Sequence, residues 1–224
     1  MPEIVVENRF DAGRKLAEKL TAYKGRSAIV LAIPNGGVPV ALQVALAINA
    51  DLDLVIARKL PVPLRPEGGF GAVVDDGTVM LNQDIYRGLN LSEQQLNYQV
   101  SQVRAAIKQR SLLYRSTRPL SVIKDKTVIV IDDGLASGYT MMAAVESVRR
   151  RGPREVVVAV PAASAVAVKM LEKVADRVVT VATSYAPKFY ISDYYRYWHS
   201  LSDDEGLKCL KEFQRRRNQP DLTA

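Results

Sequence analysis

The sequence predicts one α/β domain whose central sheet is mostly parallel, with helices on both faces. Short apolar runs rich in Val and Ile alternate with amphipathic helical patterns, which is typical of consecutive βαβ units. The chain has 224 residues, 48% hydrophobic and 25% charged, enough for one sizeable core. It shows no secretion signal and no apolar run of the roughly 18–20 residues that a membrane span needs. A single cysteine excludes an intrachain disulfide, so we expect a cytoplasmic protein.

The first half of the sequence predicts strand and helix in alternation, then a loop and a hairpin. We expect a helix over residues 11–23, a strand over 28–33, a helix over 38–48 and a strand over 54–57. Residues 58–69 contain three prolines and two glycines, which predicts a long loop. Segments 70–74 and 78–81 flank Asp75-Asp76-Gly77, a tripeptide typical of a hairpin turn.

The second half opens with a long amphipathic helix over about residues 92–115. Ser92 and Gln95 form a capping box at its start. A single apolar stripe then follows the helix: Leu96, Val100, Val103 and Ile107. Further strands are expected over 128–131, 156–160 and 178–181, and further helices over 140–151 and 164–174. We expect one domain over residues 1–202, with a small aromatic hood at about 183–200, and a helical tail over 203–224 with a frayed end.

The net charge of +7 raises the question of nucleic-acid binding, because clustered Lys and Arg side chains usually contact phosphates. Much of the excess lies in two runs, residues 149–151 and 215–217. Both runs fall near the C-terminal ends of expected helices, where cations complement the helix dipole. We therefore interpret the charge as a solvated surface and do not expect a nucleic-acid partner.

The segment 128–141 carries the chemistry. Four buried residues lead to Asp132 and Asp133, and a short loop with Ser137, Gly138 and Thr140 then leads into a helix. Backbone N–H groups and hydroxyls at a helix start bind phosphate, and ligands of open α/β sheets bind at this edge. Adjacent carboxylates accept hydrogen bonds from a ribose diol and attract a divalent cation. The segment therefore predicts a site for a ribose 5-phosphate.

This pattern of apolar strand, two acids, two variable residues, small residue, Ser or Thr, Gly, any residue and Thr resembles the signature of the type I phosphoribosyltransferases. Within that family the chain is most similar to a group of unassigned substrate. The resemblance implies transfer of 5-phosphoribosyl from phosphoribosyl pyrophosphate to a nucleobase or related heterocycle, with Mg²⁺ held mainly by the substrate. It implies that catalytic acids hold the ribose and that the following loop binds the 5-phosphate: Asp132, Asp133, Gly134, Leu135, Ala136, Ser137, Gly138, Tyr139 and Thr140.

Two further segments are candidates for binding pyrophosphate. The turn Pro34-Asn35-Gly36-Gly37 follows a strand and precedes a helix, and in relatives the equivalent turn contacts pyrophosphate, often through a cis peptide. Many relatives have Arg in place of Asn35, and a simple turn before a helix explains the sequence equally well. The resemblance also places a catalytic flap near Arg58, Lys59 and Arg65, whose charges would stabilise the departing pyrophosphate. The alternative is that these side chains are simply solvated. We favour this alternative for Arg65 and the catalytic interpretation for Arg58 and Lys59.

The hood supplies candidates for binding the base. In purine-type relatives an aromatic side chain of this segment stacks on the base, and Phe189 or Tyr190 is the equivalent here, although an aromatic after the last strand is more often core. The sole histidine, His199, is interpreted as structural. In 6-oxopurine enzymes of the family a third acid stands where this chain has Ala136, which disfavours hypoxanthine or guanine as the acceptor.

Two other classes of protein fit parts of the sequence. A non-catalytic regulator that senses phosphoribosyl pyrophosphate would keep the binding site, but no separate DNA-binding segment is evident. A phosphosugar-binding or hydrolysing protein would not need the turn at 34–37. A Walker A motif and a Gly-x-Gly-x-x-Gly fingerprint are both lacking, which argues against an NTPase or a dinucleotide enzyme. We expect the transferase, assembled as a homodimer.

Overall fold

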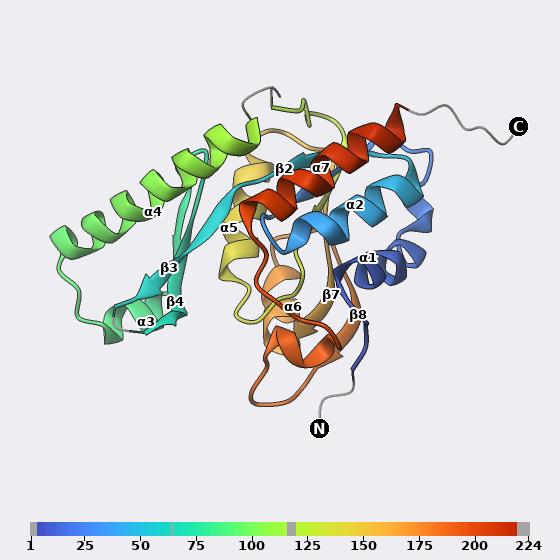
Figure 1. The fold of residues 1–224 in the computed structure, drawn as a ribbon. Helices are drawn as coiled ribbons and strands as arrows, with labels where there is room; N and C mark the ends of the chain where they lie inside the picture. The colour runs from blue at the N-terminus through green and yellow to red at the C-terminus, as the bar shows by residue number, and fades with distance from the viewer. Residues whose placement is uncertain (1–3, 64, 116–119, 219–224) are drawn as a thin grey trace, which may run out of the picture.

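The computed structural model describes residues 4–63, 65–115 and 120–218, without the side chains of residues 65–67. Its centre is a five-stranded parallel sheet with strand order β2-β1-β6-β7-β8 (Figure 1). The strands are β1 (Ala28–Ala32), β2 (Asp51–Leu54), β6 (Thr127–Ile131), β7 (Glu155–Ser164) and β8 (Arg177–Ser184). The predicted α/β fold with a parallel sheet is confirmed.

Helices cover both faces of this sheet, as the sequence predicts. One face carries α1 (Arg9–Glu18), α2 (Gly37–Ile48) and α7 (Asp203–Arg217), and the other carries α5 (Tyr139–Arg149) and α6 (Ala165–Leu171). Successive residues of β1 point to opposite faces, so Val30 joins the first core and Ile29 and Leu31 join the second. Two short 3-10 turns, η1 (Thr21–Tyr23) and η2 (Ile191–Tyr194), complete the body.

Residues 57–115 form an arm that projects from the body (Figure 1). It comprises β3 (Ala57–Val62), β4 (Arg65–Val74), β5 (Val79–Leu81), α3 (Gln83–Gly88) and α4 (Glu93–Arg115). The strands form an antiparallel sheet of order β3-β4-β5, and α4 packs against β3 and β4. The capping box before α4 is confirmed, because Gln95 N–H donates to Ser92 Oγ and Ser92 N–H donates to Gln95 Oε1.

The expected loop over residues 58–69 is wrong, because most of that segment is paired in β3 and β4. The strand expected over 54–57 also divides, since β2 ends at Leu54 and Ala57 opens β3. Prolines misled the interpretation. β3 is an edge strand, and Pro61 lies where the register with β4 shifts, so its missing N–H breaks no regular ladder. Helix α3 was not anticipated.

The N-terminal segment and the hood lie side by side. Val6 pairs with Tyr195 in an isolated parallel bridge, and the N–H groups of Val5 and Val6 both donate to the carbonyl of Tyr194. The expected helical tail is present as α7, which begins with a capping box between Ser202 and Glu205. The frayed end expected beyond it falls on residues 219–224, outside the described part of the chain. None of the described helices is long and apolar enough to cross a bilayer.

Candidate active site

The two acids follow β6 at the carboxyl edge of the parallel sheet. Five buried residues of β6 fix the strand between β1 and β7, so the chain leaves the sheet at Asp132. The N–H of Asp133 donates to Asp132 Oδ1 at 2.8 Å, and the N–H of Leu135 donates to the carbonyl of Ala162 in β7 at 2.9 Å. These bonds hold the segment after the strand against the sheet edge, where ligands of parallel α/β sheets bind.

The loop that leads into α5 has the geometry of an anion cradle. Gly138 is the N-cap residue with φ of 81°, a left-handed conformation that favours glycine, and it makes no side-chain capping bond. Among the described residues, no acceptor is found for the N–H groups of Ser137, Gly138, Tyr139 and Thr140. Unpaired N–H groups at a helix N-terminus, with its positive dipole end, bind phosphate.

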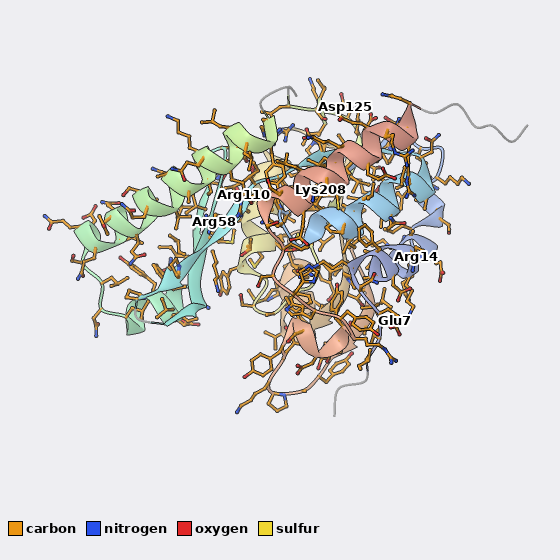
Figure 2. The ribbon with its side chains drawn as sticks, viewed as in Figure 1. Glu7, Arg14, Arg58, Arg110, Asp125 and Lys208 are labelled. Carbon is orange, nitrogen blue, oxygen red and sulfur yellow. The ribbon has the colours of Figure 1, made fainter. Side chains whose placement is uncertain are left out.

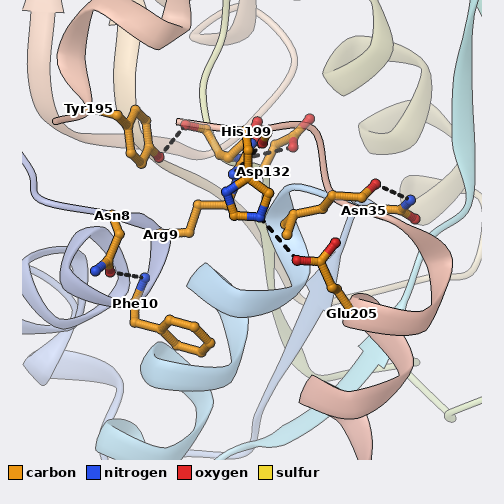
Figure 3. A network of polar contacts seen from close by, with 10 residues as sticks. Asn8, Arg9, Phe10, Asn35, Asp132, Tyr195, His199 and Glu205 are labelled. Carbon is orange, nitrogen blue, oxygen red and sulfur yellow. Dashed lines mark hydrogen bonds and ion pairs between the residues drawn. The ribbon is translucent and has the colours of Figure 1, made fainter. Parts of the chain in front are cut away.

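The acids differ in their surroundings. Burial, and next the charge of Asp133, raises the pKa of Asp132 well above its usual value. Asp133 is 9% exposed, and its Oδ2 accepts a hydrogen bond from Arg9 Nε at 2.8 Å. The hydroxyl of Tyr195 donates to the carbonyl of Asp133 at 2.7 Å (Figure 3). Asp133 is therefore paired with a cation and tied to the hood, while the desolvated carboxyl of Asp132 has no hydrogen bond to a cation among those described.

The turn at residues 34–37 packs against the acid pair. A Cβ added to Gly36 would overlap the carboxylate of Asp133, and one added to Gly37 would lie 2.6 Å from the carbonyl oxygen of Ile131, so both positions require glycine. The peptide bond between Pro34 and Asn35 is cis. This is the geometry that the family resemblance leads one to expect.

The side chain of Asn35 is used within the protein. Its Nδ2 donates to the carbonyl of Leu201 at 2.9 Å, and its Oδ1 accepts from the hydroxyl of Tyr114 at 3.0 Å. Tyr114 belongs to α4, and burial raises its pKa to about 12. Asn35 thus connects the turn to the arm and to the chain before α7, so any anion at this turn would meet backbone N–H groups.

A cavity of about 510 Å³ joins the acids, the loop, the arm and the hood. Its lining includes every residue from Asp132 to Met141, and also Lys59, Gly68, Gly69, Gly71, Phe189, Tyr190, Ile191, Ser192 and Trp198. The structure therefore brings together most of the expected site, including both aromatic candidates of the hood. Gly36 and Gly37 pack against the acids, but no residue of the turn at 34–37 is among this lining.

The basic candidates of the arm lie in different places. Lys59 lines the cavity, whereas Arg58 lies near Arg110 of α4 where the arm meets α7 (Figure 2). Although the Arg58 side chain is exposed overall, partial burial, and next the charge of Arg110, lowers its pKa, and the charge of Asp203 opposes this. The side chain of Arg65 lies outside the described part of the structure.

Sequence reasoning missed two side chains that complete the site. Arg9 comes from the first helix, far along the chain from the acids, and Trp198 is the single tryptophan of the chain, within the hood. Neither is part of a recognisable motif, so only the tertiary structure brings them to the acids. The ring of His199 contacts Glu205 Oε1 at 3.0 Å at the surface, which agrees with a structural interpretation.

The donor set suits a cation that is shared with a ligand. Within the described ranges, no three His, Cys, Asp or Glu side chains are grouped closely enough to hold a metal ion by themselves. Two adjacent carboxylates do border the cavity, and Mg²⁺ is typically bound by one or two carboxylates together with substrate phosphates and water. Asp132 and Asp133 therefore fit a substrate-borne Mg²⁺ and not a protein cage.

A parallel sheet with an acid pair and an open helix start at its carboxyl edge defines an α/β protein suited to a phosphorylated ligand. Comparison with known proteins gives the family. Residues 73–191 match the model of the phosphoribosyl transferase domain, so the chain belongs to the phosphoribosyl transferase domain family.

Relatives extend the likeness over nearly the whole chain. It is 36% identical over 209 residues to a provisionally named phosphoribosyl transferase of Mycobacterium tuberculosis, found in two strains, covering 93% of this chain and 47% of the relative. The chain thus spans about half the length of the curated relatives it matches. The crystal structure of the protein TT1426 from Thermus thermophilus superposes with a TM-score of 0.76 and 34% identity, covering 93% of this chain and 99% of that one.

Proposed function

We propose that this protein transfers a 5-phosphoribosyl group from phosphoribosyl pyrophosphate to a nitrogen of a nucleobase or related heterocycle, releasing pyrophosphate. The observation that carries the proposal is the single cavity in which the acid pair, the open N-terminus of α5, Lys59 and the hood aromatics meet. Each of these groups can bind a different part of the donor or of the acceptor. A protein that merely held a phosphosugar would have no use for a cation and two aromatic rings beside it.

Different residues bind different parts of the donor. The N–H groups of residues 137–140 and the hydroxyls of Ser137 and Thr140 bind the 5-phosphate. Asp132 and Asp133 accept hydrogen bonds from the ribose hydroxyls. Lys59 neutralises the departing pyrophosphate, while the N–H groups of Asn35 and Gly36 provide a second anion contact, since Pro34 has no N–H and that of Gly37 donates to the carbonyl of Ile33. Arg58, which lies outside the cavity, supports this charge from a greater distance.

The reaction exchanges one bond at ribose C1. The bond from C1 to the pyrophosphate oxygen breaks, pyrophosphate leaves with the electron pair, and the acceptor nitrogen forms the new bond and then releases its proton. C1 gains oxocarbenium character as in other glycosyl transfers. When bound, Mg²⁺ supplies charge neutralisation on the pyrophosphate. Positioning, charge stabilisation and exclusion of water are the contributions of the chain itself.

The acceptor stacks against the hood. Phe189 and Tyr190 provide the aromatic surface, and Phe189 is itself supported by Tyr194, with ring centroids 5.1 Å apart. Ala136 stands where the 6-oxopurine enzymes carry an acid, so we propose an acceptor other than hypoxanthine or guanine. We also propose a homodimer, because Tyr98, Leu112 and Leu113 expose apolar surface along α4. Light scattering of the purified chain tests the assembly.

The first experiment measures pyrophosphate release with Mg²⁺, the phosphoribosyl donor and a panel of purine and pyrimidine bases. Release that depends on one base supports the proposal and identifies the acceptor. A Mg²⁺-dependent rise in melting temperature with donor, without release for any base, favours the alternative of a non-catalytic donor sensor. If no base causes release and the donor does not raise the melting temperature, the assignment of this cavity to the donor is contradicted.

A further inference from the structure

Arg9 is a buried cation at the edge of the candidate site. It opens α1, and its position is fixed by Asn8, whose side-chain oxygen accepts from the N–H groups of Phe10 and Asp11 as the helix N-cap (Figure 3). Only 6% of Arg9 is exposed. A cation is buried to this degree only when its hydrogen-bonding groups and charge are satisfied.

Three groups hold the Arg9 guanidinium. Nε donates to Asp133 Oδ2 at 2.8 Å, and Nη1 donates to the carbonyl of His199 at 2.9 Å. The guanidinium carbon lies 3.9 Å from the ring centroid of Trp198, a close cation–π contact. Two directed hydrogen bonds and a stacked ring fix both the position and the plane of the group, which a lysine ammonium could not reproduce.

The hood reaches Arg9 through backbone bonds of the N-terminal segment. The N–H of Arg196 donates to the carbonyl of Val6 at 2.9 Å, and the N–H of Tyr197 donates to the carbonyl of Glu7 at 2.8 Å. These bonds place Trp198 and His199 beside the start of α1. Arg9 therefore stands where the N-terminal helix, the hood and the acid pair meet.

The contact with Asp133 has a direct consequence for ligand binding. The hydrogen bond from Arg9 Nε fixes the orientation of the Asp133 carboxylate, because the guanidinium is itself held by the carbonyl of His199 and the ring of Trp198. Arg9 takes up one acceptor position of Oδ2, and the remaining positions of the Asp133 carboxylate can accept from a ligand. On its far side, Arg9 contacts Trp198, which lines the same cavity.

We propose that Arg9 is a positioning residue of the donor site, which holds the Asp133 carboxylate oriented toward the ribose. The inference rests on the proposed function, because it takes the ribose of the donor as the ligand of Asp133. Arg9 acts through Asp133 and touches no reacting atom.

The test measures donor binding by isothermal titration calorimetry with phosphoribosyl pyrophosphate and Mg²⁺. We expect Arg9→Gln to weaken binding by roughly ten- to a hundredfold, the size of a lost charge-assisted hydrogen bond. Arg9→Lys should recover part of this loss, since it keeps the charge without the fork. The matched control is Arg14→Gln on the same helix, whose side chain is 59% exposed and paired with Asp11, and it should bind donor as the wild type does.

The chain also carries its own optical probe, because Trp198 is its single tryptophan. Loss of the stacked guanidinium should shift Trp198 emission in Arg9→Gln and leave it unchanged in Arg14→Gln. A role limited to stability would lower the melting temperature of Arg9→Gln without changing the donor affinity of the folded fraction. Wild-type affinity in folded Arg9→Gln therefore overturns the inference.

If Arg9→Gln does not fold, the double variant Arg9→Gln with Asp133→Asn provides the test, because it removes both charges of the buried pair. Positioning through Asp133 predicts that the double variant binds donor no more weakly than Asp133→Asn alone. Appreciably weaker binding by the double variant overturns the inference. Failure of the wild-type protein to bind donor overturns the proposed function instead, and this inference with it.

Discussion

The chain contains the tripeptide Asp-Asp-Gly twice, and the fold uses the two copies differently. Residues 75–77 form the turn between β4 and β5. There Asp76 Oδ1 accepts from the N–H of Thr78 at 2.8 Å, and Asp75 Oδ2 lies 3.4 Å from Arg115. Gly77 adopts φ of 91° to close the turn. These contacts fix the turn and connect it to α4 and α5, and neither acid lines the cavity.

Residues 132–134 face a cavity instead. Asp132 and Asp133 end a central strand, and the chain continues into an open helix start with a left-handed Gly138. Gly36 packs against the carboxylate of Asp133, and Arg9 is paired with it. The comparison teaches that two adjacent acids gain a function from the elements around them, here a parallel strand before them and a helix N-terminus after them.

The sharpest way to break this comparison is to neutralise each acid pair. Asp132→Asn with Asp133→Asn should lower kcat/KM for pyrophosphate release by at least about a hundredfold, because the ribose loses both charged acceptors. Asp75→Asn with Asp76→Asn should leave kcat/KM within about twofold, since these acids contact the hairpin, Arg115 and Ser147 of α5 and do not line the cavity. Steady-state kinetics on both variants decides the matter, and equal losses would contradict the assignment.

Lys59, which lines the cavity that the first pair faces, and Arg115, which is paired with Asp75, give the second test. Lys59→Met should lower kcat by roughly ten- to a hundredfold with little change in melting temperature, because Lys59 lines the cavity. Arg115→Met should do the reverse. Arg115 is paired with Asp53 and Asp75 in a largely buried cluster, so its loss should cost about 3 kcal/mol in the free energy of unfolding. Urea denaturation and kinetics on both variants separate these effects. A loss of stability in Lys59→Met together with a loss of kcat in Arg115→Met would refute the comparison.

A third pair of variants compares glycines. Gly36→Ala places a methyl group on the carboxylate of Asp133 and should impair donor binding measured by calorimetry. Gly77→Ala meets no atom within 4 Å, but its φ of 91° is strained for alanine, so it should cost only about 1–2 kcal/mol of stability. Donor affinity should be normal in Gly77→Ala. Normal affinity in Gly36→Ala would show that the turn can move away from the acid.

The smallest expected effect concerns pH. Burial raises the pKa of Asp132, so the folded state prefers its protonated form. The contribution of Asp132 to stability is then full below the unfolded pKa of 3.8 and is lost as the pH rises through the folded value. Asp132→Asn, which is always neutral, should therefore be more stable than the wild type at pH 7. Urea denaturation should show this difference shrinking toward pH 4, and a constant difference would contradict the assigned cause.

Sequence patterns predicted the fold where hydrophobic periodicity and capping residues are strong. Four of the five parallel strands, the two-sided helical cover, α4 with its capping box and α7 are present as expected, whereas the strand predicted over 54–57 overlaps β2 only at Leu54. The segment at 58–69 was misread, because three prolines were given more weight than its potential to form an edge strand. Proline at an edge or a register shift is compatible with pairing, but a sequence alone does not say which strand is the edge.

The candidate site shows the same limit. The acids and the loop after them were predictable because strand, acids, small residues and helix follow one another without interruption. Lys59 could be named but not distinguished from Arg58, since alternate side chains of a strand face opposite ways and the segment was taken for a loop. Arg9 could not be predicted, because its partner Asp133 lies more than one hundred residues away along the chain and only packing brings them together.

The placement of the arm between β2 and β6 also affects how the protein folds. β1 pairs with β2 soon after it in sequence, but its other neighbour, β6, is reached only after the whole arm has been synthesised. Closing so long a loop costs conformational entropy, and sheets dominated by distant pairings form slowly. The contacts of α4 with β3 and β4 are closer in sequence, so an arm that collapses first would shorten the effective loop. We therefore expect the segment that brings Lys59 to the cavity also to influence the rate at which the central sheet closes.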